Sequence, residues 1–342
     1  MTDLPSKLAA YIANRLPDAQ DLTVTALARI SGGASRETYR FRLSYRDAHG
    51  EHIEQPLILR RDPPSSLIDT QRKIEFAAYR AFESSAVPVP KMLWLEEDEA
   101  HLGHPFFIAQ EIAGFEASPM VILAPPYAAH HAAFAERKWT ILGEIAKADP
   151  DALDLMDAFE PVAADAAWRR ELDYWQGVID EDELAPQPII RAAIRWLRAN
   201  PPAPAQKIGV VHGDYRTGNF LYDTEGGIHG VLDWEMAHLG DPLEDLAWSF
   251  NPIWRWAKDE RVGGLTTREH AIAIWERASG LKADPVALRW WEIFNCVKGQ
   301  GIWVSSAKAW SDGENRDPIL IFSAWLMGNA QDRGALSLMG RL

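Results

Sequence analysis

The chain has 342 residues, of which 47% are hydrophobic and 25% are charged, as in an ordinary globular protein with room for two domains and a large core. Its 49 acidic and 35 basic side chains give a formal net charge of −14, which does not favour nucleic acid because nucleic-acid binding depends on basic patches. The single cysteine, Cys296, excludes an intrachain disulfide and a thiolate metal site, and it fits a reducing cytoplasm.

The start of the chain lacks the basic segment and the long apolar core of a signal peptide. No apolar run approaches the roughly 18 residues that a membrane-spanning helix needs. We therefore expect a cytoplasmic protein with no membrane partner and no nucleic-acid partner. The sequence gives no indication of the oligomeric state.

The first part of the chain predicts a helix and two strands. Apolar residues at helical spacing predict the helix over residues 5–15, and alternating apolar and polar residues predict strands over 22–30 and 39–45. The turn between the strands contains Gly32, Gly33 and Ser35, and backbone N–H groups of such a turn could approach phosphates. It lacks the Gly-Lys-Ser/Thr ending of a Walker A loop.

A third strand, over residues 56–61, ends in two arginines, and the prolines at 63 and 64 stop it. Alternation along a strand places Ile58 and Arg60 on one face. The elements expected next are a helix over 67–83 and strands over 92–96 and 105–112.

After Gly114 the pattern becomes helical. Nine of the 15 tryptophans follow Gly240, and we assign most of them to the core, leaving two or three around Trp254 and Trp303 for a substrate pocket. The expected helices cover residues 128–148, 163–179, 188–199, 243–250, 267–280, 285–310 and 318–330.

The most informative stretch lies between these helices. Apolar runs at 208–211 and 228–232 predict buried strands. Between them lie a polar loop, a third short apolar piece at 219–222 and a turn of hairpin composition at 223–227. The hairpin would bring Asp214, Asn219 and Asp233 together at one end. Two carboxylates and an amide are all-oxygen ligands that suit Mg²⁺, and this order of residues is typical of kinase catalytic loops. Each residue alone could be an ordinary turn residue, but the ordered set indicates a site.

This stretch resembles the aminoglycoside phosphotransferase and choline kinase superfamily, relatives of protein kinases, in two motifs. They are His212-Gly213-Asp214-x-x-x-x-Asn219 and Leu232-Asp233-Trp234-Glu235. The continuation, Met236-Ala237-x-x-Gly240-Asp241-Pro242-Leu243-x-Asp245-Leu246-Ala247, resembles the branch of kinase-like domains fused to acyl-CoA dehydrogenases. The resemblance runs from about Leu22 to the final helices, although the Leu-His pair that family members often carry near the end of the 128–148 helix is missing.

The resemblance implies an α+β, bilobal protein kinase-like fold. Residues 1–112 would form an N-terminal nucleotide-binding lobe, an antiparallel β-sheet with a helix. Residues 113–342 would form a larger, mainly α-helical C-terminal lobe with the catalytic loop and the acceptor site.

The resemblance also implies roles for the motif residues. Asp214 would accept or orient the proton of the acceptor hydroxyl, and Asn219 and Asp233 would hold Mg²⁺. His212 and Asp245 would brace the catalytic loop. Asp241 would cap the next helix, which its type and the following proline also favour.

In the N-terminal lobe, Arg60 would take the place of the usual lysine that grips nucleotide phosphates, with Glu75 as its helix partner. Alternatives are that Arg61 or Lys73 takes this role, or that Glu75 is a solvated charge. The Gly32, Gly33 and Ser35 turn would be the nucleotide loop. Backbone groups near Glu111 and Ile112 would hold the base at the hinge.

The function implied is a Mg²⁺-dependent transfer of the γ-phosphoryl group of ATP or GTP to a hydroxyl of a small molecule, and the branch suggests a hydroxyacyl-type acceptor. Alternatives are an aminoglycoside or choline-type kinase, or a catalytically silent nucleotide-binding module, against which the presence of all three catalytic residues argues. A protein kinase is a weaker alternative, because the segment after Asp233 is too short to form a peptide platform. The sequence does not identify the acceptor or distinguish ATP from GTP.

Overall fold

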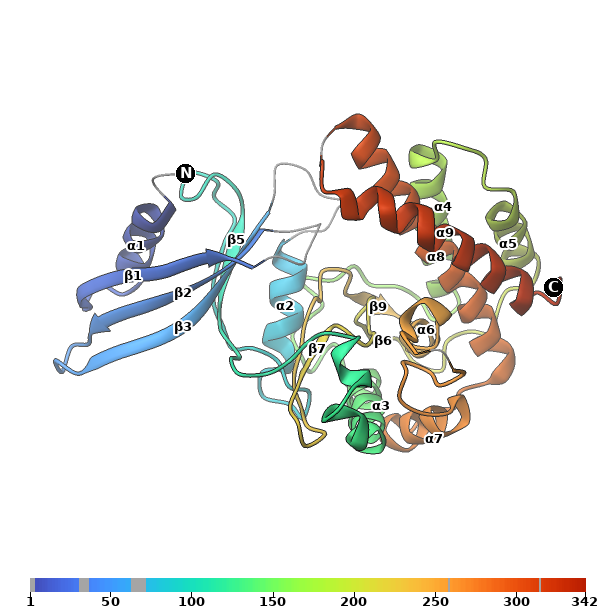
Figure 1. Cartoon of the computed structure of the whole chain (residues 1–342), viewed down its shortest axis with the longest axis horizontal. Helices are drawn as coiled ribbons and strands as arrows, with labels where there is room; N and C mark the ends of the chain where they lie inside the picture. The colour runs from blue at the N-terminus through green and yellow to red at the C-terminus, as the bar shows by residue number, and fades with distance from the viewer. Residues whose placement is uncertain (1–3, 31–36, 63–71, 258, 314) are drawn as a thin grey trace.

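The computed structural model of the chain describes residues 4–30, 37–62, 72–257, 259–313 and 315–342. Gly32, Gly33 and Ser35 of the expected nucleotide loop lie outside these ranges. A sheet with its helices occupies one end of the molecule and a helical assembly the other (Figure 1). This arrangement is the α+β architecture, a sheet part followed by a mainly helical part, that is expected from the sequence.

The N-terminal part is a five-stranded antiparallel sheet with the strand order β1-β2-β3-β5-β4. The expected strands are present, with ends that differ by a few residues. Its elements are α1 (Leu4–Arg15), β1 (Gln20–Arg29), β2 (Glu37–Arg46), β3 (His52–Arg61), α2 (Arg72–Phe82), β4 (Met92–Glu96) and β5 (Phe106–Gln110).

Alternation along β3 decides which residues reach the cleft. Leu57 and Leu59 are fully buried on the face that packs with α1. Ile58 and Arg60 therefore project from the opposite face, toward α2 and the C-terminal part. The parity argument made from the sequence agrees with this arrangement.

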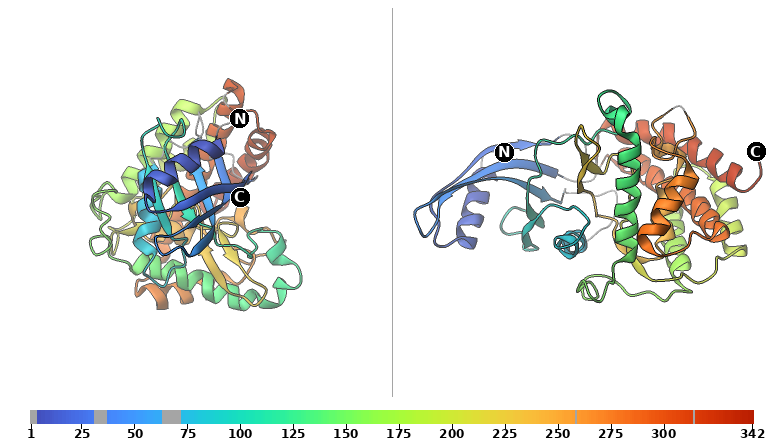
Figure 2. Two further views of the ribbon diagram at one scale, coloured as in Figure 1. Left: turned by 90° about the vertical axis from the view of Figure 1, so that its left-hand side faces the viewer. Right: turned by 90° about the horizontal axis from the view of Figure 1, so that it is seen from below.

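Side chains on the two faces of β5 pack in two different apolar cores. Phe106 and Ile108 join the α1 core, whereas Phe107 and Ala109 join the core that fills the C-terminal part. That second core also includes Ala78, Tyr79 and Phe82 of α2. Helix α2 is therefore packed into the C-terminal core, while the long strands of the sheet extend away from it (Figure 2).

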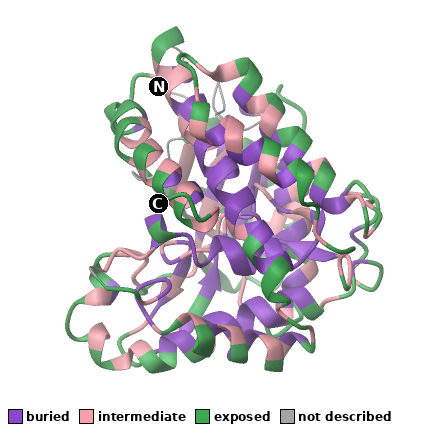
Figure 3. Ribbon diagram, turned by 90° about the vertical axis from the view of Figure 1, so that its right-hand side faces the viewer, coloured by how far each residue is buried: buried purple, intermediate pink, exposed green. Residues whose placement is uncertain are grey.

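The C-terminal part consists of helices around four short strands, and its central helices are mostly buried (Figure 3). Strand β7 pairs with β8, as the hairpin pattern predicts, and β6 pairs with β9. The sequence did not predict β9, which is only three residues long. The strands are β6 (Gly209–Val211), β7 (Phe220–Tyr222), β8 (Ile228–Val231) and β9 (His238–Gly240).

The helices expected from the apolar spacing are present, but several of them begin or end at other residues than expected. Helix α9 continues eight residues beyond the expected end at 330, and this extension buries Gln331 and Ala335. A 3-10 turn precedes α3. The helical segments are η1 (Val121–Leu123), η2 (Tyr127–His130), α3 (His131–Lys147), α4 (Ala167–Asp182), α5 (Pro188–Ala199), α6 (Leu243–Trp248), η3 (Pro252–Trp254), α7 (Arg268–Ser279), α8 (Pro285–Asp312) and α9 (Pro318–Leu338).

Helix α8 is apolar on nearly all sides and is buried over most of its length, as a helix surrounded by others requires. It packs against α4, α5, α6 and α9. Within the described ranges, none of the helices combines the length and the apolar character needed to span a bilayer.

Candidate active site

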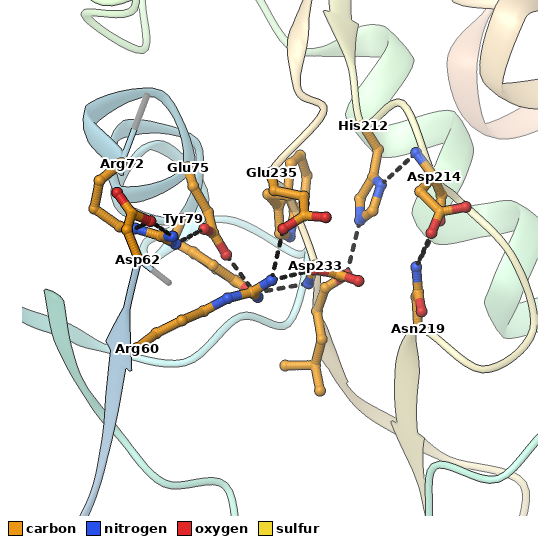
Figure 4. Close-up of polar contacts among 12 residues, drawn as sticks. Arg60, Asp62, Arg72, Glu75, Tyr79, His212, Asp214, Asn219, Asp233 and Glu235 are labelled. Carbon is orange, nitrogen blue, oxygen red and sulfur yellow. Dashed lines mark hydrogen bonds and ion pairs between the residues drawn. The ribbon is translucent and has the colours of Figure 1, made fainter. Parts of the chain in front are cut away.

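The candidate catalytic loop leaves β6 at His212 and turns sharply at Gly213. Gly213 has φ of 85°, and a Cβ at this position would lie 2.4 Å from the carbonyl oxygen of Met236. Only glycine fits such a turn against a neighbouring backbone. The turn directs the side chain of Asp214 toward Asn219 (Figure 4).

Asp214 accepts hydrogen bonds from three side chains. The Nδ2 of Asn219 donates to its Oδ2 (2.7 Å), the indole Nε1 of Trp248 donates to its Oδ1 (2.7 Å), and the Nε of Arg216 contacts both oxygens (3.1 and 3.0 Å). Burial raises the pKa of Asp214 above its usual value, against the opposing charge of Arg216. The carboxylate is thus fixed in orientation and made more basic than an exposed aspartate.

His212 braces the loop. Its Nδ1 accepts the backbone N–H of Asp214 (3.1 Å), so the proton lies on Nε2, which donates to the carbonyl of Leu232 (3.0 Å). Burial lowers the pKa of His212 to about 4, which keeps the ring neutral near pH 7. With both nitrogens occupied, His212 links the catalytic loop to the chain just before Asp233.

Asp245 of α6 holds the same loop through its backbone. Its carboxylate accepts the N–H of His212 (2.6 Å) and the N–H of Gly213 (3.0 Å). Burial, with Glu244 next to it, raises the pKa of Asp245 to about 6. These are the contacts expected of a residue that braces a kinase catalytic loop.

Lys298 of α8 fixes the loop from the other side. Its Nζ donates to the carbonyl of Gly213 (2.6 Å) and to Glu244 Oε1 (2.9 Å), and it lies 5.1 Å from the ring centroid of Trp248. Glu244 also accepts from His238 Nε2 (3.2 Å). This group of buried charges supports the peptide next to Asp214.

Glu171, His238 and Glu244 place their ligand atoms within 4.8 Å of one another, as a metal site would require. Cations already neutralise both carboxylates, because Lys298 contacts Glu244 and the Nε of Arg170 donates to Glu171 (3.1 Å). Burial opposes the charged imidazolium, but Glu171 and Glu244 outweigh it and raise the pKa of His238 to about 9. We therefore assign these residues to a buried ion-pair network.

Asp233 follows β8 in a left-handed conformation, with φ of 69°. Its backbone N–H donates to the hydroxyl of Tyr79 (2.9 Å), and its Oδ1 accepts from Arg60 Nη2 (2.5 Å). Burial opposes ionisation, but Arg60 outweighs it and lowers the pKa of Asp233. The carboxylate is therefore ionised near pH 7.

Arg60 lies between the two parts of the molecule and contacts three carboxylates (Figure 4). Its Nη1 is 2.7 Å from Glu75 Oε1, and its Nη2 is 3.0 Å from Glu235 Oε2 as well as 2.5 Å from Asp233. Glu75 is only 1% exposed, which excludes the solvated alternative. The guanidinium thus joins the sheet, helix α2 and the segment after β8.

The alternative partners of Glu75 lie elsewhere. Arg61 donates to Glu37 (3.0 and 2.5 Å) and to the carbonyl of Leu102 (2.9 Å), and Lys73 is exposed. The second arginine on Glu75 is instead Arg72, which the sequence had not indicated. Arg72 also contacts Asp62 at the end of β3 (Figure 4).

A cavity of about 640 Å³ opens between the two parts. Within it, Glu111 and Ile112 lie at the hinge, and the backbone N–H of Glu111 is engaged by the carbonyl of Pro56 (3.0 Å). The remaining backbone groups of this pair are the ones left for a base. Other residues that line the cavity include Arg60, Tyr79, Arg216, Asn219 and Asp233.

The oxygens on this cavity fit Mg²⁺ by chemistry and by placement. Asn219 makes its contacts to Asp214 with the amide nitrogen, which leaves its side-chain oxygen for a metal. Asp233 supplies an ionised carboxylate on the same cavity wall. An amide oxygen and a carboxylate completed by phosphates and water are ligands that Mg²⁺ accepts.

Asp241 stabilises the start of α6, but not as its cap residue. The cap position is held by Pro242, whereas Asp241 Oδ1 accepts the N–H of Leu243 (3.0 Å) and its Oδ2 accepts from Trp291 Nε1 (3.0 Å). The helix begins at Leu243, one residue later than it would if Asp241 were the cap residue. The expected capping contact is present at this shifted position.

The tryptophans near the catalytic loop form a cluster. Trp254 packs against Trp248, Trp256 and Trp303, and the guanidinium of Arg216 lies 4.5 Å from its ring centroid. Trp254 is buried, and Trp256 and Trp303 are half-buried. The cluster therefore adjoins Asp214 through Trp248, near the residues expected for a substrate pocket.

The model of the phosphotransferase enzyme family, APH, matches residues 26–281 of this sequence. The chain belongs to this family. The match covers most of the sheet, the hinge, the catalytic loop and helices through α7, so it includes Arg60, Glu75, Asp214, Asn219 and Asp233.

The relatives of this APH-family chain include the probable acyl-CoA dehydrogenase IBR3 of Arabidopsis thaliana, which is 31% identical over 299 residues. That alignment covers 80% of this chain and 34% of the relative. The chain spans between 20% and 40% of the length of the curated relatives that it matches. The homology to acyl-CoA dehydrogenase family members that the sequence motifs suggested is confirmed.

Solved structures confirm the APH fold. A Ralstonia eutropha protein provisionally described as an aminoglycoside phosphotransferase superposes with a TM-score of 0.75 at 20% identity, over 98% of each chain. A thermostable mutant of the aminoglycoside phosphotransferase APH(4)-Ia, in a ternary complex with ADP and hygromycin B, gives a TM-score of 0.60 at 18% identity, over 98% of each chain. At this identity the likeness shows the fold alone.

Sequence reasoning missed several residues of the APH-family site. Glu235 stands within the quoted motif, and Tyr79 lies four residues after Glu75, so helical spacing could have indicated it. Arg216 lies within the catalytic loop, where its charge was the available signal. Trp248 and Lys298 carried no such signal, because their contacts with the loop depend on how α6 and α8 pack.

Proposed function

We propose that the chain is a Mg²⁺-dependent small-molecule kinase that transfers the γ-phosphoryl group of ATP or GTP to a hydroxyl. The observation that carries this proposal is the convergence of Asn219, Asp233 and Arg60 on one cavity between the lobes, with Asp214 held next to it by its hydrogen bond from Asn219. Family membership supports the same reaction class. We propose residues 1–112 as the nucleotide-binding lobe and 113–342 as the lobe of the catalytic loop and acceptor.

In the proposed mechanism, Asp214 orients the acceptor hydroxyl and takes its proton as the oxygen attacks the γ-phosphorus, while the bond from that phosphorus to the β-phosphate oxygen breaks and ADP or GDP leaves. The bonds from Asn219 and Trp248 fix its carboxylate in one direction, and its raised pKa strengthens it as a base. Positioning of this kind supplies much of the rate acceleration in phosphoryl transfer. A positioned base contributes about 10²–10⁴-fold.

Arg60 would hold the nucleotide phosphates, since its guanidinium can grip two oxygens at once. Glu75 and Glu235 would keep it in place while its contact with Asp233 is exchanged for contacts with phosphate. Asn219 and Asp233 would hold Mg²⁺, which offsets phosphate charge when it is bound. Gly32, Gly33 and Ser35 are proposed to cover the phosphates, and Glu111 and Ile112 to hold the base through their backbone.

For the acceptor we propose a hydroxyacyl compound, because the relatives of this chain are named as acyl-CoA dehydrogenases. Aminoglycosides and choline-type alcohols are the competing acceptors, and the complex of APH(4)-Ia with hygromycin B is the reason to include the first of these. The tryptophan cluster beside Asp214 could contact an apolar chain or an amine.

The proposal is tested by measuring ADP or GDP release from Mg²⁺-nucleotide with a panel of acceptors. The panel contains a 4-hydroxyacyl-CoA, an aminoglycoside, choline and a sugar alcohol, with Asp214→Ala as the control. We expect release that depends on one acceptor and is lost in the variant, whose fold is checked by its thermal transition. Mg²⁺-nucleotide binding without turnover for any acceptor would instead favour the silent nucleotide-binding module.

A further inference from the structure

One face of helix α2 holds two parts of the candidate site. Glu75 and Tyr79 are four residues apart and therefore lie on the same side of the helix, one turn apart. Glu75 is ion-paired with Arg60 (2.7 Å), and the hydroxyl of Tyr79 accepts the backbone N–H of Asp233 (2.9 Å). Arg60 also contacts Asp233 (Figure 4). Contacts therefore run from Glu75 through Arg60 and Asp233 to Tyr79, and helix α2 joins the two ends of this series.

The backbone of Asp233 needs support from its surroundings. With φ of 69° it adopts the left-handed conformation, which residues other than glycine rarely take and which neighbouring contacts must maintain. The hydroxyl of Tyr79 binds the N–H of this same residue. The contact therefore fixes the direction in which the Asp233 carboxylate leaves the backbone.

Tyr79 is placed rigidly enough to do this. It is only 3% exposed, and its ring packs against Phe107 of β5 and Trp234, with ring centroids 6.1 and 6.2 Å away. Packing of the ring does not require the hydroxyl, so the oxygen has a separate role. A phenylalanine would retain the ring contacts and remove only the bond to Asp233.

We propose that Tyr79 is a positioning residue for the metal-binding aspartate. By accepting the N–H of Asp233, its hydroxyl holds the carboxylate in the orientation that binds Mg²⁺, and it couples that orientation to the helix that also holds Arg60. The inference rests on the proposed function, in which Asp233 is a Mg²⁺ ligand. It adds to that function a residue that acts on the metal through the backbone.

Two variants separate this role from ordinary structural support. Tyr79→Phe removes the hydroxyl in question. Tyr222→Phe is the matched control, because Tyr222 is also fully buried and its hydroxyl also bonds to backbone, donating to the carbonyl of Ser118 (2.7 Å). Both variants lose one buried hydrogen bond, and only the first one lies at Asp233.

The first measurement is binding of AMP-PNP by calorimetry at increasing Mg²⁺ concentrations. For Tyr79→Phe we expect the Mg²⁺ concentration at half-maximal binding to rise about tenfold, because a buried N–H loses its partner next to the metal ligand. For Tyr222→Phe we expect no change in this concentration. Equal Mg²⁺ dependence in the two variants would overturn the proposal while leaving the proposed function intact.

The second measurement needs neither nucleotide nor metal. Amide hydrogen exchange in the peptide that contains Asp233 should be faster in Tyr79→Phe than in wild type, and unchanged in Tyr222→Phe. Unchanged exchange in Tyr79→Phe would overturn the positioning role directly. A wild-type protein whose nucleotide binding ignores Mg²⁺ would instead overturn the proposed function, and the metal role of Tyr79 with it.

Discussion

The two halves of the candidate site are held in different ways. The catalytic loop is fixed from within the C-terminal core, where Asp245 and Lys298 bind the backbone at Gly213 and Trp248 binds Asp214. The other half depends on Arg60, which lines an open cavity together with Asp233, while its other two carboxylate partners, Glu75 and Glu235, are buried beside it. The comparison indicates that Asp214 is a preorganised base, whereas Arg60 can exchange a carboxylate contact for a contact with a nucleotide phosphate.

The largest effect should follow from removing the buried cation of the first half. In Lys298→Met, Glu244 remains buried without its ammonium partner, and we expect the free energy of unfolding to fall by about 3–5 kcal/mol. Denaturant unfolding measures this change. The double variant Lys298→Met, Glu244→Gln should recover part of the lost stability. If Lys298→Met alone were as stable as wild type, the buried ion pair would not stabilise the catalytic loop.

A smaller, pH-dependent effect should come from His238. Its folded pKa of about 9 exceeds the unfolded value, so its contribution to stability is complete below about pH 6.5 and is lost as the pH rises through 9. Relative to His238→Gln, wild type should lose roughly 2–3 kcal/mol of unfolding free energy across this interval. If the difference in unfolding free energy between the two proteins did not change with pH, His238 would not be a charged member of the ion-pair network.

The smallest effect should appear in nucleotide binding by Arg60. Arg60→Lys replaces a planar fork by a single ammonium, so we expect about a tenfold rise in the KM for nucleotide with little change in stability. Arg61→Lys is the matched control, because Arg61 is adjacent on β3 but pairs with Glu37. If the control raised KM equally, the contacts of Arg60 would not explain nucleotide binding.

Much of this arrangement could be predicted from the sequence, because it depends on local periodicity. Alternation along β3 places Arg60 opposite α2, and the hairpin spacing brings Asn219 and Asp233 to one end. The interpretation of Arg60 and Glu75 as partners was correct as geometry, while their role toward nucleotide stays a prediction.

The missed features depend on packing between distant segments. Lys298 reaches Gly213 from a helix 85 residues later, and Tyr79 reaches Asp233 across 154 residues. Strand β9 is too short to show a period, and its pairing with β6 is decided by the turn at Gly213 and the packing of α6. Neither kind of contact leaves a repeating pattern along the chain.

The shared core around α2 has a consequence for how this protein evolves. Because Ala78, Tyr79 and Phe82 complete the core of the C-terminal part, a fragment that ended at the hinge would expose them to solvent. Loss of either lobe would leave this core incomplete, so we expect the two lobes to be retained together as one module. Helix α1 lies in the sheet part and the end of α9 lies in the helical part (Figure 1), so a domain joined before α1 or after α9 would not separate the two lobes.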